Sequence, residues 1–181
     1  VVLGDNKPDY GKEWNEFEKK QVVQHLNLGP DKKVLDIGCG IGRWAENIID
    51  HCGEYIGTDF SDEMIKSAGE RFKSYSNALF INSSFQDIFK NKKIIGKKFD
   101  TVIIAGVSMY INDVDLRKGY DSLADVLNEG AIVYIEESIG VNERLTLDHI
   151  WSDSLKDNYD AIYRTRKEYL ELMSGLTNRV Q

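Results

Sequence analysis

The sequence predicts a doubly wound α/β domain, in which a parallel sheet carries helices on both faces. Five short apolar runs, rich in β-branched residues, alternate with segments whose apolar residues recur at helical spacing. The first run leads into three glycines at alternate positions, Gly38, Gly40 and Gly42, and then into a helical pattern. A strand, a glycine-rich turn and a helix in this order hold nucleosides or nucleotides in such sheets.

The composition is that of an ordinary soluble globular domain. The 181 residues fit one domain, with 41% hydrophobic and 29% charged residues. A formal net charge of -7 disfavours a nucleic-acid partner. The apolar runs are too short for a membrane span and no secretory signal is visible, so we expect a cytoplasmic protein with no membrane partner. Cys39 and Cys52 have no metal-binding spacing, and a disulfide is not expected in a reducing compartment.

A helix is expected ahead of the first strand. Its pattern runs from Lys12 to Leu26, with Trp14 and Phe17 on one side, and Gly29-Pro30 stops it. This helix either packs on the sheet edge or acts as a lid, in which Tyr10 or Trp14 closes over the ligand.

The glycine turn follows a strand that contains Val34, Leu35 and Ile37. A dinucleotide-binding turn needs a small residue at position 43, and this chain has arginine there. Asp36, just before the turn, would repel a pyrophosphate and attract a cationic group. The turn therefore favours a positively charged nucleoside ligand over a dinucleotide.

The segment Asp36-Ile37-Gly38-Cys39-Gly40-Ile41-Gly42 resembles motif I of the class I S-adenosylmethionine-dependent methyltransferases, and the resemblance extends from Lys33 to Glu137. It implies the Rossmann-like methyltransferase fold and S-adenosyl-L-methionine as the cofactor. In that family the acid of the motif, here Asp36, lies near the amino acid end of the cofactor. The nucleoside packs on the loop, which here contains Gly38, Cys39 and Gly40.

The second strand, Glu54 to Phe60, ends beside another acid. Asp59 lies about 20 residues beyond the glycine turn, where a carboxylate accepts hydrogen bonds from both ribose hydroxyls. Asp59 would otherwise cap the next helix, but Ser61 is an equally good cap. Phe60 is then expected against the adenine. Met64 begins the buried stripe of the following helix and is a further cofactor-binding candidate.

A third strand, Ala78 to Asn82, leads into a turn that contacts the adenine edge in this methyltransferase family. The family often has an acid where this chain has Ser84. Ser84 or the main-chain N–H of Phe85 is the expected contact. Two other roles stay open, Phe85 as a core residue and Asp87 as a turn residue.

The fourth strand, Phe99 to Ala105, is a β-branched run typical of a strand covered on both faces. In the family the segment that follows, here Gly106 to Ile111, borders the transferable methyl group, so Ala105 and Gly106 are predicted to bind the cofactor. The segment lacks the Asn/Asp-Pro-Pro-aromatic tetrapeptide of enzymes that methylate bases or glutamine, which disfavours a base-modifying role. Tyr110 either hydrogen-bonds an incoming amine or hydroxyl or caps the sheet edge.

A helix starts at Asn112 and ends at Asn128-Glu129-Gly130, and the fifth strand follows from Ala131 to Glu136. Ligands of open α/β sheets lie beyond the carboxyl ends of the strands, so Glu136 and Glu137 are expected near the substrate. A like-charged pair can raise one pKa toward base chemistry, although solvated carboxylates are the alternative.

Beyond Gly140 the pattern predicts two helices, Leu145–Leu155 and Tyr159–Met173. Many small-molecule methyltransferases build the substrate pocket from an insertion here, although aromatic residues at helical spacing more often belong to a core. The candidate pocket residues are His149, Trp151, Tyr159, Tyr163 and Arg164. The resemblance also implies a final antiparallel strand pair, for which residues 174–181 are too short. The predicted single domain thus has an N-terminal helix or lid (1–30), a cofactor-binding core (31–140) and a helical substrate-pocket insertion (141–181).

Together these features predict a methyltransferase that transfers the methyl group, without a metal, to an amine or hydroxyl of a small-molecule acceptor. The histidines are scattered and form no metal-ligand pattern, and His149, Tyr110 and Glu136 are the candidate catalytic bases. The alternatives are a non-catalytic module that binds S-adenosylmethionine and a nucleotide-cofactor oxidoreductase. The identity of the acceptor and the oligomeric state stay open.

Overall fold

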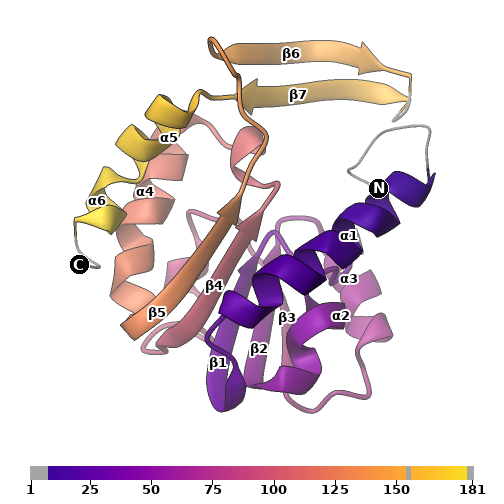
Figure 1. Cartoon of the computed structure of the whole chain (residues 1–181), viewed down its shortest axis with the longest axis vertical. Coiled ribbons are helices and arrows are strands. Elements are labelled where there is room, and N and C mark those ends of the chain that lie inside the picture. Colours follow the sequence, from indigo (N-terminus) through magenta and orange to yellow (C-terminus); the bar gives the residue numbers. More distant parts are fainter. Residues whose placement is uncertain (1–7, 154–155, 179–181) are drawn as a thin grey trace.

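The computed structural model describes residues 8–153 and 156–178. A five-stranded parallel sheet forms the centre of the fold, in the order β3-β2-β1-β4-β5 (Figure 1). The strands are β1 (Gly29–Ile37), β2 (Cys52–Asp59), β3 (Ala78–Asn82), β4 (Phe99–Ala105) and β5 (Leu127–Glu136). The strand order reverses between β1 and β4, so the carboxyl ends of these two strands border the crevice where such sheets bind ligands.

The two central strands are buried on both faces, as their apolar runs predict. β4 is buried along nearly its whole length, and β1 is buried from Val34 to Ile37. Val34 lies opposite Thr101 and Ile37 opposite Ile104, in register with β4. Parallel strands covered on both sides read as continuous hydrophobic runs, which is why the sequence identified these elements.

Helices cover both faces of the sheet, which confirms the predicted fold class (Figure 1). On one face lie α1 (Pro8–Val22), α2 (Ala45–Ile48) and α3 (Asp62–Arg71), and on the other α4 (Asp113–Leu123), α5 (Arg166–Leu172) and α6 (Ser174–Thr177). Between β3 and β4 the chain forms a 3₁₀ turn in place of an α-helix, and Phe85, Ile88 and Ile94 fill that face. None of the described helices combines the length and the apolar character that a membrane span requires.

The segment after β5 corrects the prediction of a helical insertion. The sequence predicts a helix over Leu145–Leu155, but residues 145–152 form β6 (Leu145–Ser152), and β7 (Asp157–Tyr163) pairs with it in an antiparallel hairpin. Residues 154–155 of the predicted helix lie outside the described residues. Among the described residues after β5, only Arg166–Leu172 and Ser174–Thr177 are α-helical. The strand register is irregular between Leu147 and Ile150, so the apolar residues there fall at spacings of three and four, which imitate a helix.

Candidate cofactor and acceptor site

The three glycines of the loop after β1 serve different purposes. All three adopt positive φ, at +73° for Gly38, +54° for Gly40 and +85° for Gly42. A Cβ on Gly38 would lie 2.2 Å from Val107 Cγ2, and one on Gly42 would lie 2.5 Å from Phe72 Cε2. A Cβ on Gly40 would meet nothing within 4 Å. Gly38 and Gly42 are therefore required by internal packing, whereas Gly40 faces open space, as a loop that receives a nucleoside must.

Asp59 connects the end of β2 to this loop. Its Oδ2 accepts a hydrogen bond from the Gly40 N–H at 3.0 Å, and its Oδ1 accepts one from the Ser61 N–H at 2.9 Å. Ser61 Oγ accepts from the Met64 N–H and caps α3, which is the division of roles expected from the sequence. Asp59 thus lies beside Gly40 with its carboxylate at the open side of the loop.

Replacing Asp59 with alanine is expected to weaken binding of the predicted cofactor, S-adenosylmethionine, by roughly 1–3 kcal/mol, because its hydrogen bond with the Gly40 N–H and the predicted hydrogen bonds to the ribose are lost. Calorimetric titration measures this change. Asp62→Ala is the control, because Asp62 is an exposed acid of the first turn of α3. Unchanged affinity of the Asp59 variant would remove this residue from the cofactor site.

The residues predicted to contact the adenine, Phe60, Ser84 and Phe85, differ in the exposure and the contacts of their side chains. Phe60 is 78% exposed and follows Asp59 directly, so its ring is free to support a flat ligand. Ser84 Oγ donates to Asp87 Oδ2 at 2.9 Å. Phe85 is buried and packs edge-on against Tyr120, with 5.7 Å between ring centroids. The side chain of Phe85 therefore belongs to the core, so a contact of this residue with a ligand would have to be made by its main chain.

Asp36 is buried beneath the loop. It is 2% exposed, and the Tyr55 hydroxyl donates to its Oδ2 at 2.5 Å. Burial raises the pKa of Asp36 to about 7, although the hydrogen bond from Tyr55 and the charge of Arg43 oppose this shift. The carboxyl group is thus only partly ionised at neutral pH. Cys39 is also buried, and its N–H donates to the Thr58 carbonyl at 2.9 Å.

Arg43, the residue that departs from the dinucleotide pattern, holds α1 on the loop. It forms an ion pair with Glu18, which is buried on α1 and also accepts a hydrogen bond from the Tyr134 hydroxyl at 3.3 Å. Sequence reasoning missed Glu18. A charged residue four positions after Trp14, on the same helix face, was the available signal. The side chain of Tyr10, proposed for the lid, lies outside the described residues.

The segment after β4 is held by Glu137, the neighbour of the predicted Glu136. Gly106 has a φ of +69°, and its N–H donates to the Glu136 carbonyl at 2.8 Å. Glu137 Oε1 accepts hydrogen bonds from the Val107 N–H at 3.1 Å and the Ser108 N–H at 2.7 Å. Burial raises the pKa of Glu136, and the negative charge of Glu18 raises it further. Glu136 therefore faces the charges at α1, while Glu137 organises the segment that carries Tyr110.

The hairpin brings two tyrosines to Tyr110. The Tyr110 and Tyr159 hydroxyls lie 3.4 Å apart, and those of Tyr159 and Tyr163 lie 3.0 Å apart. The rings of Tyr110 and Tyr159 meet edge to face, with centroids 6.1 Å apart. Burial raises the pKa of all three phenols, to about 12 for Tyr163. These side chains, which we call the tyrosine cluster, are neutral at physiological pH.

His149, the third predicted base, lies elsewhere on the hairpin. Its side chain is 74% exposed, and its Nδ1 lies 2.9 Å from Asp148 Oδ1 and 3.2 Å from Asp160 Oδ1. Hydrogen bonding to Asp148 raises the pKa of His149. Among the described residues these three are the one group whose ligand atoms lie within 4.8 Å of one another, and all three are exposed. The structure thus brings Tyr110 together with Tyr159 and Tyr163, and it engages the ring of His149 with two neighbouring acids.

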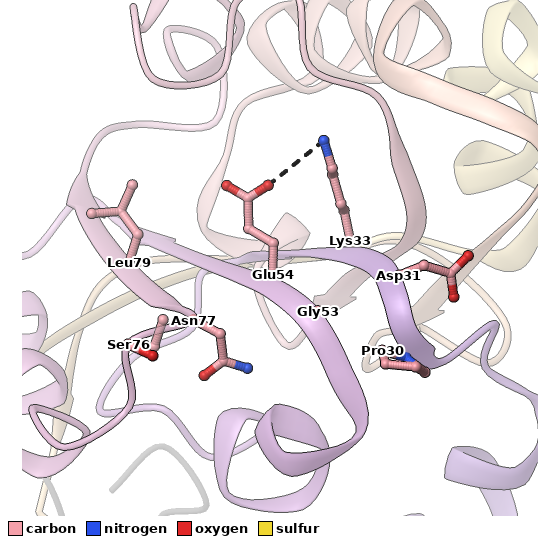
Figure 2. Close-up of a pocket in the computed structure, with 9 residues that line it drawn as sticks. Pro30, Asp31, Lys33, Gly53, Glu54, Ser76, Asn77 and Leu79 are labelled. Atoms are coloured by element: carbon pink, nitrogen blue, oxygen red, sulfur yellow. Dashed lines mark ion pairs between the residues drawn. The ribbon is translucent and has the colours of Figure 1, made fainter.

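A hollow of about 450 Å³ lies at the opposite edge of the sheet from the loop (Figure 2). It is formed at the amino ends of β1, β2 and β3, where Lys33 and Glu54 form an ion pair at 3.8 Å. Its lining residues are Pro30, Asp31, Lys33, Gly53, Glu54, Ser76, Asn77, Ala78 and Leu79. Since ligands of open α/β sheets bind at the carboxyl ends of the strands, this hollow is separate from the cofactor site.

The fold and the loop define a Rossmann-like domain that binds a nucleoside or nucleotide. A parallel sheet with this strand order, a glycine-rich loop after β1 and an acid at the end of β2 occur in dinucleotide-binding domains and in S-adenosylmethionine-dependent methyltransferases, and Arg43 departs from the dinucleotide pattern. A family model described as "Methyltransferase domain" matches residues 35–133, more than half of the chain. The chain belongs to this family, and its cofactor is S-adenosyl-L-methionine.

Curated relatives carry several methyltransferase names. "Ribosomal RNA small subunit methyltransferase A" of Dehalococcoides mccartyi is 26% identical over 124 residues, which is 67% of this chain and 41% of the relative. "Phosphoethanolamine N-methyltransferase 1" of Arabidopsis thaliana is 25% identical over 179 residues, which is 99% of this chain and 34% of the relative. The chain thus spans less than half the length of these two relatives.

Solved structures share the fold. A methyltransferase from Clostridium acetobutylicum matches with a TM-score of 0.68 and 19% identity, covering 97% of this chain and 82% of that one. Phosphoethanolamine N-methyltransferase 1 of Haemonchus contortus, solved with phosphoethanolamine and S-adenosylhomocysteine, matches with a TM-score of 0.70 and 18% identity, covering 88% and 34%. At these identities the likeness concerns the fold.

Proposed function

We propose that this protein transfers the methyl group of S-adenosylmethionine to an amino group of a small molecule, without a metal. The observation that carries the proposal is the tyrosine cluster, in which Tyr159 and Tyr163 of the hairpin meet Tyr110 of the segment after β4. Its phenols have raised pKa values and are therefore neutral hydrogen-bonding groups, not bases. An amine loses its proton readily in water, whereas a hydroxyl acceptor needs a strong base or a metal. Neutral tyrosines therefore fit an amine better than a hydroxyl.

The names of several relatives support an amine acceptor. Phosphoethanolamine N-methyltransferases of wheat, Arabidopsis and maize are among the relatives, with 24–29% identity. "Nodulation protein S" of Rhizobium tropici is 27% identical over 121 residues, and a solved NodS of Bradyrhizobium japonicum carries the name N-methyltransferase. These names describe those proteins, and they make a small amine the first acceptor class to test.

The ribosomal RNA methyltransferases among the relatives suggest nucleic acid as a second acceptor class. The formal net charge of -7 opposes it, because a nucleic-acid substrate requires a basic surface. The segment Gly106-Val107-Ser108-Met109 also lacks the Asn/Asp-Pro-Pro-aromatic tetrapeptide that accompanies base methylation in this family.

Each part of the site has a role in the proposed reaction. Gly40 leaves space for the nucleoside, Asp59 accepts from the ribose hydroxyls, and Phe60 supports the adenine. The tyrosine cluster holds the acceptor so that its nitrogen lone pair faces the methyl carbon. The new N–C bond forms as the C–S bond breaks in line with it, and the released amine proton passes to water. Alignment of donor and acceptor is the main contribution to the rate.

Calorimetric titration with S-adenosylmethionine and S-adenosylhomocysteine tests the cofactor, with NADH as the control ligand. Release of S-adenosylhomocysteine is then measured with phosphoethanolamine, an amino sugar, a catechol and a short RNA as acceptors. Turnover with an amine and none with the catechol or the RNA is expected. Cofactor binding without turnover on any acceptor would favour a non-catalytic binding module, and NADH binding would favour an oxidoreductase.

A further inference from the structure

We propose that Arg164 is a positioning residue, which fixes the segment Val107–Ile111 and the β6–β7 hairpin to each other and thereby assembles the tyrosine cluster. The proposal rests on the function proposed above, because that cluster is the inferred acceptor site. Arg164 was expected among the pocket residues. It is instead fully buried, with 0% exposure, at the junction between β7 and α5.

The guanidinium of Arg164 donates hydrogen bonds to two main-chain carbonyl groups of the segment Val107–Ile111. Its Nη1 donates to the Ser108 carbonyl at 2.8 Å, and its Nη2 donates to the Ile111 carbonyl at 2.5 Å. Ser108 is the first residue of the 3₁₀ turn Ser108–Tyr110, and Ile111 follows its last residue. A buried guanidinium with several fixed donors makes a rigid joint, because charge-assisted hydrogen bonds are stronger than neutral ones.

Two N–H groups of the same segment donate to the carboxyl group of Glu137. Glu137 accepts from Val107 and Ser108, while the Ser108 hydroxyl lies 2.9 Å from the Tyr120 hydroxyl on α4. Every polar atom of Ser108 is thus held, and the residue is fully buried. Met109 and Tyr110 follow Ser108 directly. The position of Tyr110 therefore depends on the hydrogen bonds that Glu137 and Arg164 make to this segment.

Arg164 also fixes the hairpin at its base. Its Nε donates to Asp113 Oδ1 at 2.8 Å, and Arg144, just before β6, donates to both oxygens of the same carboxylate at 2.8 and 3.2 Å. Both ends of the hairpin therefore converge on Asp113 at the start of α4. The rest of the hairpin stands beyond the carboxyl ends of β4 and β5 (Figure 1). A two-stranded hairpin is marginally stable alone. The joint that Arg164 and Arg144 form with Asp113 therefore decides where Tyr159 and Tyr163 lie.

Hydrogen exchange followed by mass spectrometry tests the proposal without an acceptor. In Arg164→Met, the amides of residues 107–111, 145–153 and 156–163 are expected to exchange about tenfold faster or more, as for the loss of hydrogen bonds to a buried charge. The amides of β1 and the glycine loop are expected to keep their rates. The control is Arg117→Met, which removes an exposed arginine that donates to the Glu171 carbonyl at 3.2 Å. Equal exchange in the two variants would overturn the proposal, and so would a uniform increase over the whole chain.

The kinetic consequence is measured with S-adenosylmethionine and the amine acceptor that gives turnover in the wild-type protein. We expect KM for the amine to rise about tenfold in Arg164→Met while the Kd of the cofactor changes little. Arg164→Lys retains the charge without the fork and is expected to fall between wild type and Arg164→Met. A cofactor Kd that rises as much as KM would indicate a general structural role and refute the proposal.

Asp113→Asn provides a second route if Arg164→Met does not fold. This variant weakens the hydrogen bonds of Arg164 and Arg144 to residue 113, so faster exchange in residues 145–153 and 156–163 is expected. Unchanged exchange there would count against the proposal. Absence of methyl transfer by the wild-type protein would refute the proposed function. It would leave the exchange experiment as a valid test of the joint.

Discussion

Replacing Gly40 with valine is expected to abolish binding of S-adenosylmethionine, with a loss of affinity of at least about 100-fold, or roughly 3 kcal/mol of steric conflict. A Cβ at this position meets no protein atom within 4 Å, so a side chain there starts in the space inferred for the nucleoside. The fold is expected to persist with reduced stability, because valine at a φ of +54° strains the backbone while its Cβ meets no protein atom within 4 Å. Calorimetric titration with S-adenosylhomocysteine and the thermal unfolding temperature are the two measurements.

Gly96→Val is a matched control for the backbone. Gly96 has a φ of +78°, and a Cβ there also meets nothing within 4 Å, but this residue lies in the connection between β3 and β4. A β-branched residue at positive φ strains both sites to a similar degree. The control is therefore expected to show a similar drop in stability with normal cofactor binding. Normal binding by Gly40→Val would refute the placement of the nucleoside on the loop.

Replacing Asp36 with asparagine is expected to stabilise the ligand-free protein above neutral pH and to weaken cofactor binding. Burial raises the pKa of Asp36 from 3.8 to about 7. Between these two values the folded state binds more protons than the unfolded state, so the free energy of unfolding falls as the pH rises. The loss is complete above about pH 7 and amounts to at most roughly 4 kcal/mol. An asparagine has no charge to desolvate and avoids this loss.

Urea unfolding at pH 5 and pH 8 measures the effect. The stability advantage of Asp36→Asn is expected to grow between the two values, whereas its affinity for S-adenosylmethionine falls because the neutral amide no longer attracts the cationic cofactor. A constant advantage at both pH values would show that Asp36 titrates normally.

Asp100→Asn is a control of opposite sign. Burial raises the pKa of Asp100, but hydrogen bonds from the Lys33 N–H at 2.9 Å and from Asn128 at 3.0 Å, with the nearby charge of Lys32, outweigh burial and lower it. The ionised form of Asp100 thus stabilises the fold. Its stabilisation is present above the unfolded pKa and is lost as the pH falls through the folded pKa. Asp100→Asn is therefore expected to be less stable than the wild type at both pH 5 and pH 8.

The sequence predicts the sheet and the glycine loop because the patterns that specify them lie in short segments of the chain. The loop, the strand on each side and the acid at the end of β2 are set by residues whose backbone and burial requirements appear in short segments. The Ser61 cap of α3 follows the prediction, and Asp59 accepts a hydrogen bond from the Gly40 N–H of the loop. The reason for Arg43 did not follow, because its partner Glu18 lies 25 residues earlier and only packing of α1 on the loop brings the two together.

The structure of the segment after β5 was decided by tertiary contacts. The apolar spacing of Leu147, Ile150 and Trp151 fits a helix as well as an irregular strand, and pairing with β7 selected the strand. Arg164 reads as a surface or pocket cation in the sequence, yet the carbonyls of Ser108 and Ile111 with the carboxylate of Asp113 make its burial favourable. The sequence by itself determined the sheet, the glycine loop and the cofactor. The hairpin and the tyrosine cluster depend on contacts between segments about 50 residues apart, which no local pattern specifies.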